Sequence, residues 1–384
     1  MRASNSVLTR SVLKTIFSSL AVILTLAGCG QFFPPLSSGS GGSGSSSGDY
    51  IYAGNLGTNP LTVAGFAVAS TGLTKSSGSP YSVSLEPTAL AITPSDSYLY
   101  MGSAAGGIYV FTIGSTGALT LGNGGTPVAT GVEPSVLRVD PTGKWLLGAD
   151  AFAGEAYVFQ IGTGGALTSI STSVVTLNAS DPATDLEITP SGSYVFVACG
   201  TGGIYTMSFD TSTGALAQIN TVLPVKQSGD ADYGMAITPS GSLLFAAETG
   251  IGAVRVFSIS SSGTLTETSN SPVATGTGAY AVLVDSTGSY VYVANRTEGN
   301  ISAFLLTNSG ALTAIAGSPF STGSLPEEMV EDKTKTYIAV VCAGGSPDLR
   351  VFTIGTTTPG ALTSLGTATT GTDPTSASSI AATH

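Results

Sequence analysis

The stretch TPSGSYVFVACGTGGIYTMSFDTSTGALAQI, residues 189–219, decides the fold. It opens with a Pro-Ser-Gly turn, in which proline presets one backbone dihedral angle and glycine accepts a positive φ. Apolar runs at 194–198, 204–209 and 215–219 follow, and their aromatic and β-branched residues are typical of strands. A fourth run, at 232–237, precedes the next copy of the turn. The stretch predicts one small antiparallel sheet of four strands.

This pattern recurs along the chain. The first turn reappears as TPSDS (93–97), DPTGK (140–144), TPSGS (238–242), DSTGS (285–289) and DKTKT (332–336). A second turn, of the type STGALT, supplies seven glycines spaced 45 to 50 residues apart: Gly72, Gly117, Gly165, Gly214, Gly263, Gly310 and Gly360. A sheet with two apolar faces needs neighbours of its own kind. Seven such units predict an all-β fold, a seven-bladed β-propeller of four-stranded antiparallel blades, since solenoids have shorter repeats and tandem sandwiches longer ones.

The two ends of the repeat array predict how the ring closes. The first copy begins at its second strand, at 50–53, and has no innermost strand of its own. A surplus strand-like run, at 376–382, follows the last copy. We therefore expect the C-terminal strand to complete the N-terminal blade, which leaves no long unpaired edge.

Residues 1–28 have the pattern of a targeting segment. Arg2, Arg10 and Lys14 are followed by an apolar core at 16–27, which is too short for a stable membrane span. The core ends in Leu-Ala-Gly-Cys at 26–29, which resembles the bacterial lipobox, and that resemblance implies lipidation of Cys29 and removal of residues 1–28. The alternative is an ordinary signal peptide with an incidental cysteine.

The next segment, 29–48, contains an unbroken Ser/Gly run at 37–48 and is expected to be a flexible tether. Residues 49–384 are then the propeller, held at a bacterial membrane through the lipid alone and facing the periplasm or the cell surface. The formal net charge is −11, the opposite of what nucleic-acid binding favours. A monomer is expected. Cys199 and Cys342 fall in blades nearly opposite one another, which predicts two buried free thiols.

The segment YVYVANRTEGNISAF at 290–304, together with the repeated turns, resembles the seven-bladed propeller lactonases. This family includes propeller-type 6-phosphogluconolactonases and related Tyr-Val-Thr-Asn repeat proteins. The resemblance implies a site in the central cleft, in which histidine, arginine and glutamate take part. Arg296, in the loop after 290–295, matches the family's arginine. The only histidine is His384, at the last position, which we expect to be disordered, so a carboxylate would have to act as general base.

Acidic residues replace the expected histidines at the loops that lead into the innermost strands. With Arg296 they form the candidate ligand-binding set: Glu86, Glu133, Asp181, Asp232, Arg296, Glu327 and Asp373. Asp150, Glu155, Glu248 and Asp348 are expected on the same face. The functional interpretation is a ligand or activated-water site, or a site for a divalent cation, whose preferred ligands are oxygens. The structural interpretation is a solvated rim in which Asp-Pro and Glu-Pro form turns.

Arg138 and Glu187 occupy the same position in neighbouring innermost strands, and they would pair across two blades unless the strand registers differ by one residue. No Gly-x-Ser-x-Gly elbow with acid and histidine partners occurs, so the many turn serines do not indicate a nucleophile. The sequence thus predicts an envelope lipoprotein propeller without a required cofactor. It would bind an envelope protein, a glycan or a small molecule at its acidic channel mouth. The alternative function is hydrolysis of a lactone of the 6-phosphogluconolactone type.

Overall fold

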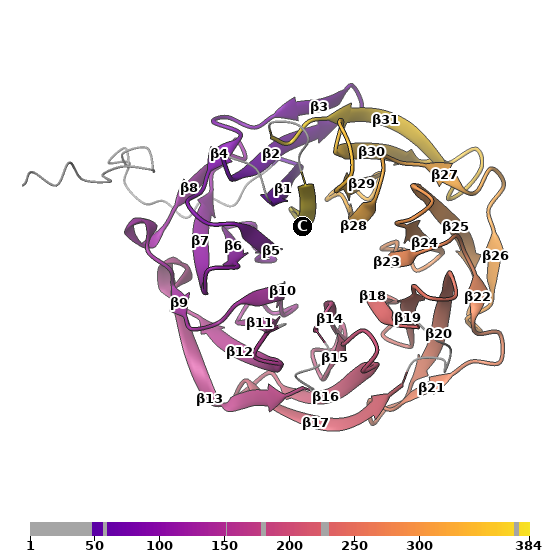
Figure 1. Cartoon of the computed structure of the whole chain (residues 1–384), viewed down its shortest axis with the longest axis horizontal. Coiled ribbons are helices and arrows are strands. Elements are labelled where there is room, and N and C mark those ends of the chain that lie inside the picture. Colours follow the sequence, from indigo (N-terminus) through magenta and orange to yellow (C-terminus); the bar gives the residue numbers. More distant parts are fainter. Residues whose placement is uncertain (1–47, 57–59, 151, 178–181, 224–229, 372–375) are drawn as a thin grey trace, which may run out of the picture.

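The computed structural model describes residues 48–56, 60–150, 152–177, 182–223, 230–371 and 376–384. They form seven antiparallel sheets arranged as the blades of a closed ring (Figure 1). The predicted seven-bladed propeller is therefore confirmed. Cys29, Asp181, Asp373, residues 1–28 and most of the expected tether lie outside the described residues.

Each blade has four main strands, which run in order from the channel to the rim. The innermost strands, from blade 1 to blade 7, are β32 (Ser376–Ala382), β5 (Pro87–Ile92), β10 (Pro134–Val139), β14 (Asp185–Ile188), β18 (Asp232–Ile237), β23 (Ala279–Val284) and β28 (Pro326–Glu331). The second strands are β1 (Tyr50–Leu56), β6 (Tyr98–Ser103), β11 (Trp145–Asp150), β15 (Tyr194–Ala198), β19 (Leu243–Glu248), β24 (Tyr290–Asn295) and β29 (Tyr337–Cys342).

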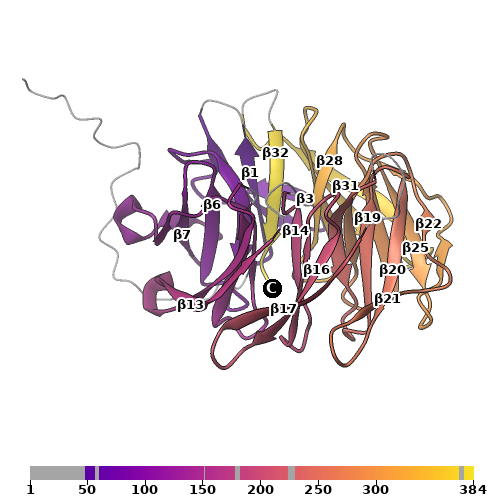
Figure 2. The same cartoon turned by 60° about the horizontal axis from the view of Figure 1, so that its bottom comes forward.

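The outer half of each blade repeats in the same way, and Figure 2 shows the strands running between the two faces of the ring. The third strands are β2 (Thr62–Ala69), β7 (Gly107–Ile113), β12 (Glu155–Ile161), β16 (Ile204–Asp210), β20 (Ala253–Ile259), β25 (Asn300–Leu306) and β30 (Leu349–Ile354). The outermost are β3 (Gly72–Lys75), β8 (Leu119–Leu121), β13 (Leu167–Thr176), β17 (Ala215–Val222), β21 (Leu265–Glu267), β26 (Leu312–Ala314) and β31 (Leu362–Ala368).

Four blades carry a short fifth strand that the sequence did not indicate. Each pairs with the third strand beside a short outermost strand: β4 (Tyr81–Ser82), β9 (Ala129–Thr130), β22 (Val273–Ala274) and β27 (Phe320–Ser321). In blades 3, 4 and 7 the outermost strand is instead longer and continuous. In these four blades the short outermost strand and the fifth strand both pair with the third strand, so together they replace the single long outermost strand of the other blades. Two single 3-10 turns, η1 (Asn123–Gly125) and η2 (Thr163–Gly165), lie in outer connections.

The repeated turn motif is held by its first residue. In DPTGK, Asp140 accepts hydrogen bonds from the backbone N–H of Thr142, Lys144 and Trp145, at 3.0, 2.8 and 2.7 Å. In TPSGS, the Thr189 hydroxyl accepts from the Tyr194 N–H at 3.1 Å. Gly192 has φ of +71°, a conformation that costs glycine little. The serines and threonines of this face, here called the turn face, therefore have structural partners.

Ring closure follows the predicted route. β32 pairs antiparallel with β1, with Ala382 opposite Ile51 and Ile380 opposite Ala53. The Tyr50 N–H donates to the Thr383 hydroxyl, and the Thr383 N–H returns a bond to the Tyr50 carbonyl. His384, expected to be disordered, is instead described: its N–H donates to Asp96 at 2.7 Å, and its ring nitrogen lies 3.3 Å from the Ile92 carbonyl. That expectation was wrong because the preceding strand carries the last residue onto blade 2.

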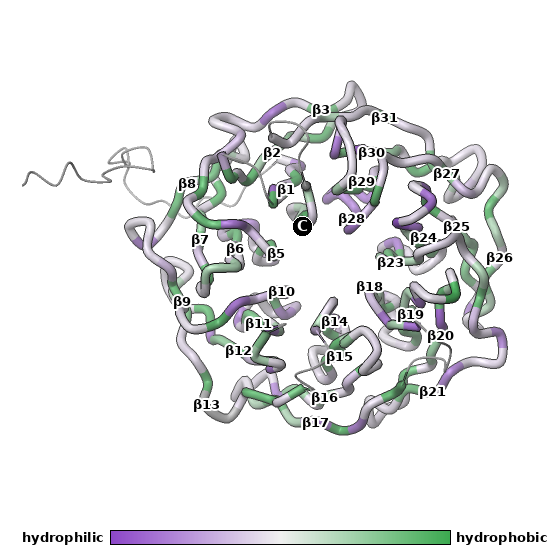
Figure 3. The backbone as a smooth tube through the Cα atoms, viewed as in Figure 1, coloured by the Kyte–Doolittle hydropathy of each residue, from purple (hydrophilic) through white to green (hydrophobic). Residues whose placement is uncertain are grey.

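The hydrophobic core is divided among the interfaces between blades. Each of the seven buried clusters in the described residues joins two adjacent blades, and the cluster around Ile51, Val341 and Ile380 seals the closing interface. The hydrophobic segments in Figure 3 follow the strands, whereas hydrophilic ones appear at the ends and on several inner strands. Cys199 and Cys342 are buried and form no disulfide, as predicted. None of the described helices is long and apolar enough to cross a bilayer.

Candidate functional site

A cavity of about 1240 Å³ occupies the channel at the centre of the ring. The innermost strands of all seven blades line it. Six of them shift register near their start, for example between Pro134 and Val136 and between Pro326 and Glu328. Such a bulge breaks the strict alternation of faces. The loops before these strands and after the second strands form one end of the channel, here called the mouth.

Position along the repeat sets the depth of each lining residue. The position five residues ahead of the first turn lies near the mouth, and in four blades it is occupied by Thr184, Tyr233, Tyr280 and Glu327. The position four residues ahead of the turn is held by Asp185 and Glu328 in their blades. The position two residues ahead, nearer the turn face, is held by Arg138 and Glu187. The channel therefore has a mouth tier that contains two tyrosines and Glu327, and a deeper tier in which charged side chains dominate.

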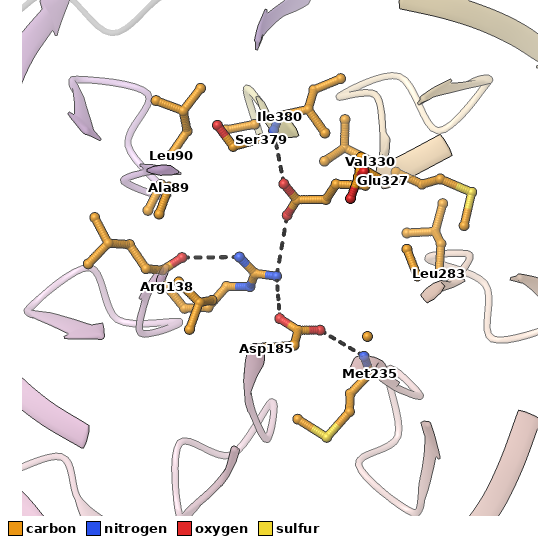
Figure 4. A pocket seen from close by; sticks show the side chains of 18 of the residues that line it. Ala89, Leu90, Arg138, Asp185, Met235, Leu283, Glu327, Val330, Ser379 and Ile380 are labelled. Atoms are coloured by element: carbon orange, nitrogen blue, oxygen red, sulfur yellow. Dashed lines mark hydrogen bonds and ion pairs between the residues drawn. The ribbon is translucent and has the colours of Figure 1, made fainter. Parts of the chain in front are cut away.

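The deeper tier is an ion-pair network around one arginine, here called the Arg138 network. Arg138, from blade 3, contacts Asp185 at 2.9 Å and Glu187 at 3.6 Å, both from blade 4. Its Nη2 also lies 3.5 Å from Glu328 of blade 7, on the other side of the channel. Figure 4 shows the guanidinium between these carboxylates. The predicted Arg138–Glu187 pair thus forms, and the alternative of registers that differ by one residue was wrong.

Backbone donors hold two of the three carboxylates in place. Asp185 accepts from the N–H of Leu186 at 2.8 Å and of Met235, in blade 5, at 2.7 Å. Glu328 accepts from the N–H of Ile380, in the closing strand β32, at 2.9 Å. The network therefore links blades 3, 4, 5, 7 and 1 through the channel. Its positions are fixed by rigid strands rather than by loops.

Burial shifts the acid–base behaviour of this network. Burial raises the pKa of Glu187 to about 8 and that of Glu328 to about 7, against the opposing attraction of Arg138. Burial also raises the pKa of Asp185, although Arg138 and two backbone N–H donors counteract it. Around neutral pH Glu187 and Glu328 therefore retain part of their protons, which lowers the negative charge around Arg138.

These shifts predict that stability falls as the pH rises. An unfolded glutamate loses its proton near pH 4.3, so between about pH 4.5 and 8 the folded protein binds more protons than the unfolded chain. Asp49 and Glu248 add to this trend, since burial raises their pKa values to about 7 and about 9. We expect the melting temperature to fall by roughly 5 °C from pH 5.5 to pH 8.5. Differential scanning fluorimetry would measure it, with Glu328→Gln flattening the slope; a melting temperature that rises across this window would contradict the assignment.

The mouth tier combines an ion pair with two aromatic rings. The Arg296 Nε donates to Glu327 Oε1 at 2.7 Å, and its guanidinium lies 5.3 Å from the centre of the Tyr280 ring. The Tyr280 and Tyr233 rings are 4.9 Å apart and inclined by 33°. The Arg296 N–H donates to the Gly278 carbonyl at 2.7 Å, which fixes the loop. Arg296, Glu327, Tyr280 and Tyr233 are here called the Arg296 wall. The side chain of Arg296 is 39% exposed and that of Glu327 10%, so the wall is accessible from the channel.

The sequence-predicted acids do not converge on one point. Glu86, Arg296 and Glu327 line the cavity. Glu133 does not contribute to the described lining, and its N–H donates to the buried Asp150. Asp232 is fully buried against Arg255, at 3.2 Å and away from the channel. Within the described part of the chain no three His, Cys, Asp or Glu residues are placed to hold a metal ion, so the expected cation site has no support there.

Several acids of the expected solvated rim are buried, whereas Glu86, Glu133, Glu155 and Glu327 are partly exposed. Asp150, Glu248 and Asp348 follow or end their second strands and are at most 4% exposed. Asp348 accepts from the Thr370 N–H at 2.8 Å, and Asp150 accepts from three backbone N–H groups. The expectation of exposure was wrong for these three acids. Asp150 and Asp348 are buried because they pair loop backbone N–H groups, which are costly to bury unpaired, and Glu248 lies 3.9 Å from the buried Arg255.

Four lining residues escaped the sequence interpretation: Asp185, Glu328, Tyr233 and Tyr280. The two tyrosines occur at the same repeat position in neighbouring blades, in DYG at 232–234 and AYA at 279–281. This shared position could have predicted that the two rings lie side by side. Asp185 and Glu328 also share a repeat position, four residues before the turn. Glu328 of blade 7 pairs with Arg138 of blade 3, a non-neighbouring blade, which a repeat alignment alone does not indicate.

Comparison with known proteins assigns the family. A family model described as "Lactonase, 7-bladed beta-propeller" matches residues 66–378, so the chain belongs to this family. No curated protein matches the sequence significantly.

Several solved structures share the fold, each covering 88% of this chain. A Lactobacillus plantarum protein has a TM-score of 0.72 at 20% identity, over 100% of its own length. The periplasmic gluconolactonase of Pseudomonas aeruginosa has a TM-score of 0.71 at 16% identity, over 99% of its length. A Bacteroides uniformis protein provisionally assigned as a 6-phosphogluconolactonase has a TM-score of 0.71 at 17% identity, over 100% of its length. At these identities the likeness shows the fold.

Proposed function

We propose that the protein binds a small polyhydroxylated ligand, a sugar or sugar lactone, at the channel mouth against the Arg296 wall. One observation carries this proposal: an arginine–glutamate pair and two adjacent tyrosine rings face a cavity of about 1240 Å³. Ligand sites are typically concave, with aromatic lining and a few fixed polar groups.

Each group in the wall has a complementary part on such a ligand. The Tyr233 and Tyr280 rings offer apolar surface to the C–H face of a sugar ring, while their hydroxyls and Glu327 offer hydrogen bonds to its hydroxyls. The Arg296 guanidinium retains N–H donors beyond the one that Glu327 takes, and these can donate to a ring or carbonyl oxygen. All four groups come from blades 5, 6 and 7, on rigid strands or a loop fixed by backbone bonds.

A second candidate function is hydrolysis of the bound lactone. The observation that favours it is the Glu327 carboxylate, held 2.7 Å from the Arg296 cation and facing the cavity. A carboxylate in this place can accept a proton from water as that water attacks the acyl carbon. Arg296 can then stabilise the oxyanion, after which the ring C–O bond breaks to give a hydroxy acid. Glu327 replaces the missing histidine base, since His384 lies at the turn-face end of the channel.

A matched pair of variants tests both functions. Tyr280→Ala with Arg296→Ala removes the wall, whereas Ser191→Ala with Ser240→Ala changes two exposed turn-face hydroxyls. Isothermal titration with glucose and fresh D-glucono-1,5-lactone should show at least ten-fold weaker binding by the first variant and unchanged binding by the second. A pH-stat assay would detect acid release above the spontaneous rate, and Glu327→Gln should abolish it. If the turn-face variant loses binding and the wall variant keeps it, the mouth is the wrong site.

The proposed location is outside the cytoplasm, with Cys29 as the lipid attachment point. The Leu-Ala-Gly-Cys segment motivates this, and the periplasmic location of the Pseudomonas aeruginosa neighbour supports the compartment. We expect Cys29→Ser to prevent incorporation of labelled palmitate and processing after residue 28. Gel mobility and autoradiography would show both. Equal labelling of the variant and the unaltered protein would exclude Cys29 as the lipidated residue.

A further inference from the structure

The cavity has few positive groups, and its two arginines already have anionic partners. Among the described lining residues, the basic side chains are Arg138, Arg296 and His384. Three carboxyls surround Arg138, and the Glu327 carboxylate contacts the Nε of Arg296. His384 lies at the opposite end from the mouth, where its backbone donates to Asp96.

Carboxylates outnumber these cations. The acidic side chains lining the cavity are Glu86, Asp185, Glu187, Glu327, Glu328 and Glu331. Proteins bind phosphate and carboxylate ligands with Arg or Lys donors that have no competing anion, or at helix N-termini. The described lining contains neither a lysine nor a helix. An anion in the channel would therefore meet arginines whose charge is already neutralised, next to further carboxylates.

We propose that this cavity is selective for uncharged ligands and rejects phosphorylated and carboxylated ones, with Glu327 as the specificity-determining residue. This inference rests on the proposed function, because it specifies the chemical class that the Arg296 wall accepts. Glu327 decides the specificity because it is the carboxylate paired with Arg296, the one cation among the described residues that line the mouth. Removing its charge would leave the Arg296 guanidinium above the Tyr280 ring without an ion-pair partner among the described residues. The Arg138 network cannot play this part, since Arg138 keeps two carboxyl partners after loss of either glutamate.

The same charge distribution would help product leave if the bound lactone is hydrolysed. Hydrolysis adds water across the acyl–oxygen bond and releases a proton, which converts a neutral ring into a carboxylate. That carboxylate would lie beside Glu327, in a cavity whose described lining contains five further acidic side chains, and like charges in a partly desolvated cavity repel. An uncharged substrate would thus bind, and an anionic product would dissociate.

Glucose and glucose 6-phosphate are a matched pair of probes that differ only in the phosphate, and inorganic phosphate probes the anion alone. Isothermal titration at pH 7.5 would use the full-length protein in detergent. We expect glucose to bind at least ten-fold more tightly than glucose 6-phosphate, and inorganic phosphate not to bind. The Glu327→Gln variant should bind glucose 6-phosphate and inorganic phosphate at least ten-fold more tightly than the unaltered protein does. Glu155→Gln is the control, since it removes the same charge from the mouth face outside the described cavity lining and should leave the preference unchanged.

The outcomes separate this inference from the proposed function. Equal binding of glucose and glucose 6-phosphate by the unaltered protein would overturn the selectivity while leaving the site in place. Absence of any gain in phosphate affinity in Glu327→Gln would overturn the role of Glu327, provided that the circular dichroism and melting temperature show a folded variant. If no sugar binds to either protein, the proposed function fails, but a gain in inorganic phosphate binding by Glu327→Gln would still support the charge assignment.

Discussion

Deletion of residues 374–384 is expected to lower the melting temperature by at least about 10 °C, or to prevent soluble folding. The deletion removes β32, whose Ala377, Ile380 and Ala381 are at most 7% exposed. These side chains belong to the clusters that join blade 1 to blade 7 and to blade 2. Losing a strand from two interfaces costs several kcal/mol, because each fully buried Ile-sized side chain contributes roughly 1.5–3 kcal/mol. A protein of this size loses about 2–4 °C per kcal/mol.

A rescue variant separates loss of the strand from loss of chain length. Ala382 lies opposite Ile51, so the end of β32 is close to the beginning of β1. Residues 374–384 placed before Gly48 can therefore form a hairpin with β1 and supply the same inner strand. We expect this permuted protein to recover most of the lost melting temperature. If the simple truncation melts like the intact chain, the account of ring closure is wrong.

Arg138→Met is expected to destabilise the protein by about 3 kcal/mol at pH 8.5. Removing one partner of a buried ion pair leaves an uncompensated buried charge, which typically lowers the free energy of unfolding by about 3–5 kcal/mol. We expect a loss near the lower end of this range because water can enter the channel. Asp185, Glu187 and Glu328 would then face one another without a cation. At pH 5.5 the loss should be smaller, since loss of Arg138 raises the pKa values of carboxyls that already take up protons readily.

Urea unfolding at the two pH values would measure this difference. The matched control combines Arg138→Met with Glu187→Gln and Glu328→Gln, which removes two of the opposing charges together with the cation. This triple variant should regain much of the stability at pH 8.5. Equal destabilisation of Arg138→Met at both pH values would show that packing of the arginine, and not its charge, is what the network needs.

The fold was predictable because the residues that determine each blade's strands and turns lie within a single repeat. The TPSGS turn, the glycine of STGALT and the short apolar strands act within one blade, and the ring follows from their number. Closure was also predictable, since one inner strand was missing at the start and one was in excess at the end. The fifth strands were missed because they are two-residue contacts on an outer edge without a hydrophobic pattern of their own.

The site was predictable only where its chemistry follows the repeat. Arg138 and Glu187 share a repeat position in adjacent blades, so their pairing could be predicted. Glu328 reaches the same arginine from blade 7, and this contact depends on the diameter of the ring. The acids at the mouth were predicted by position alone, which does not distinguish Glu327, facing the cavity, from Asp232, buried against Arg255.

The central claim is that the Arg296 wall is the ligand site. A crystal structure of the protein with glucose bound tests it most directly. The account predicts a sugar ring within the channel mouth, in contact with the Tyr233 and Tyr280 rings and hydrogen-bonded to Arg296 or Glu327. A sugar bound at the turn face, or outside the channel, with this wall unoccupied would contradict the claim.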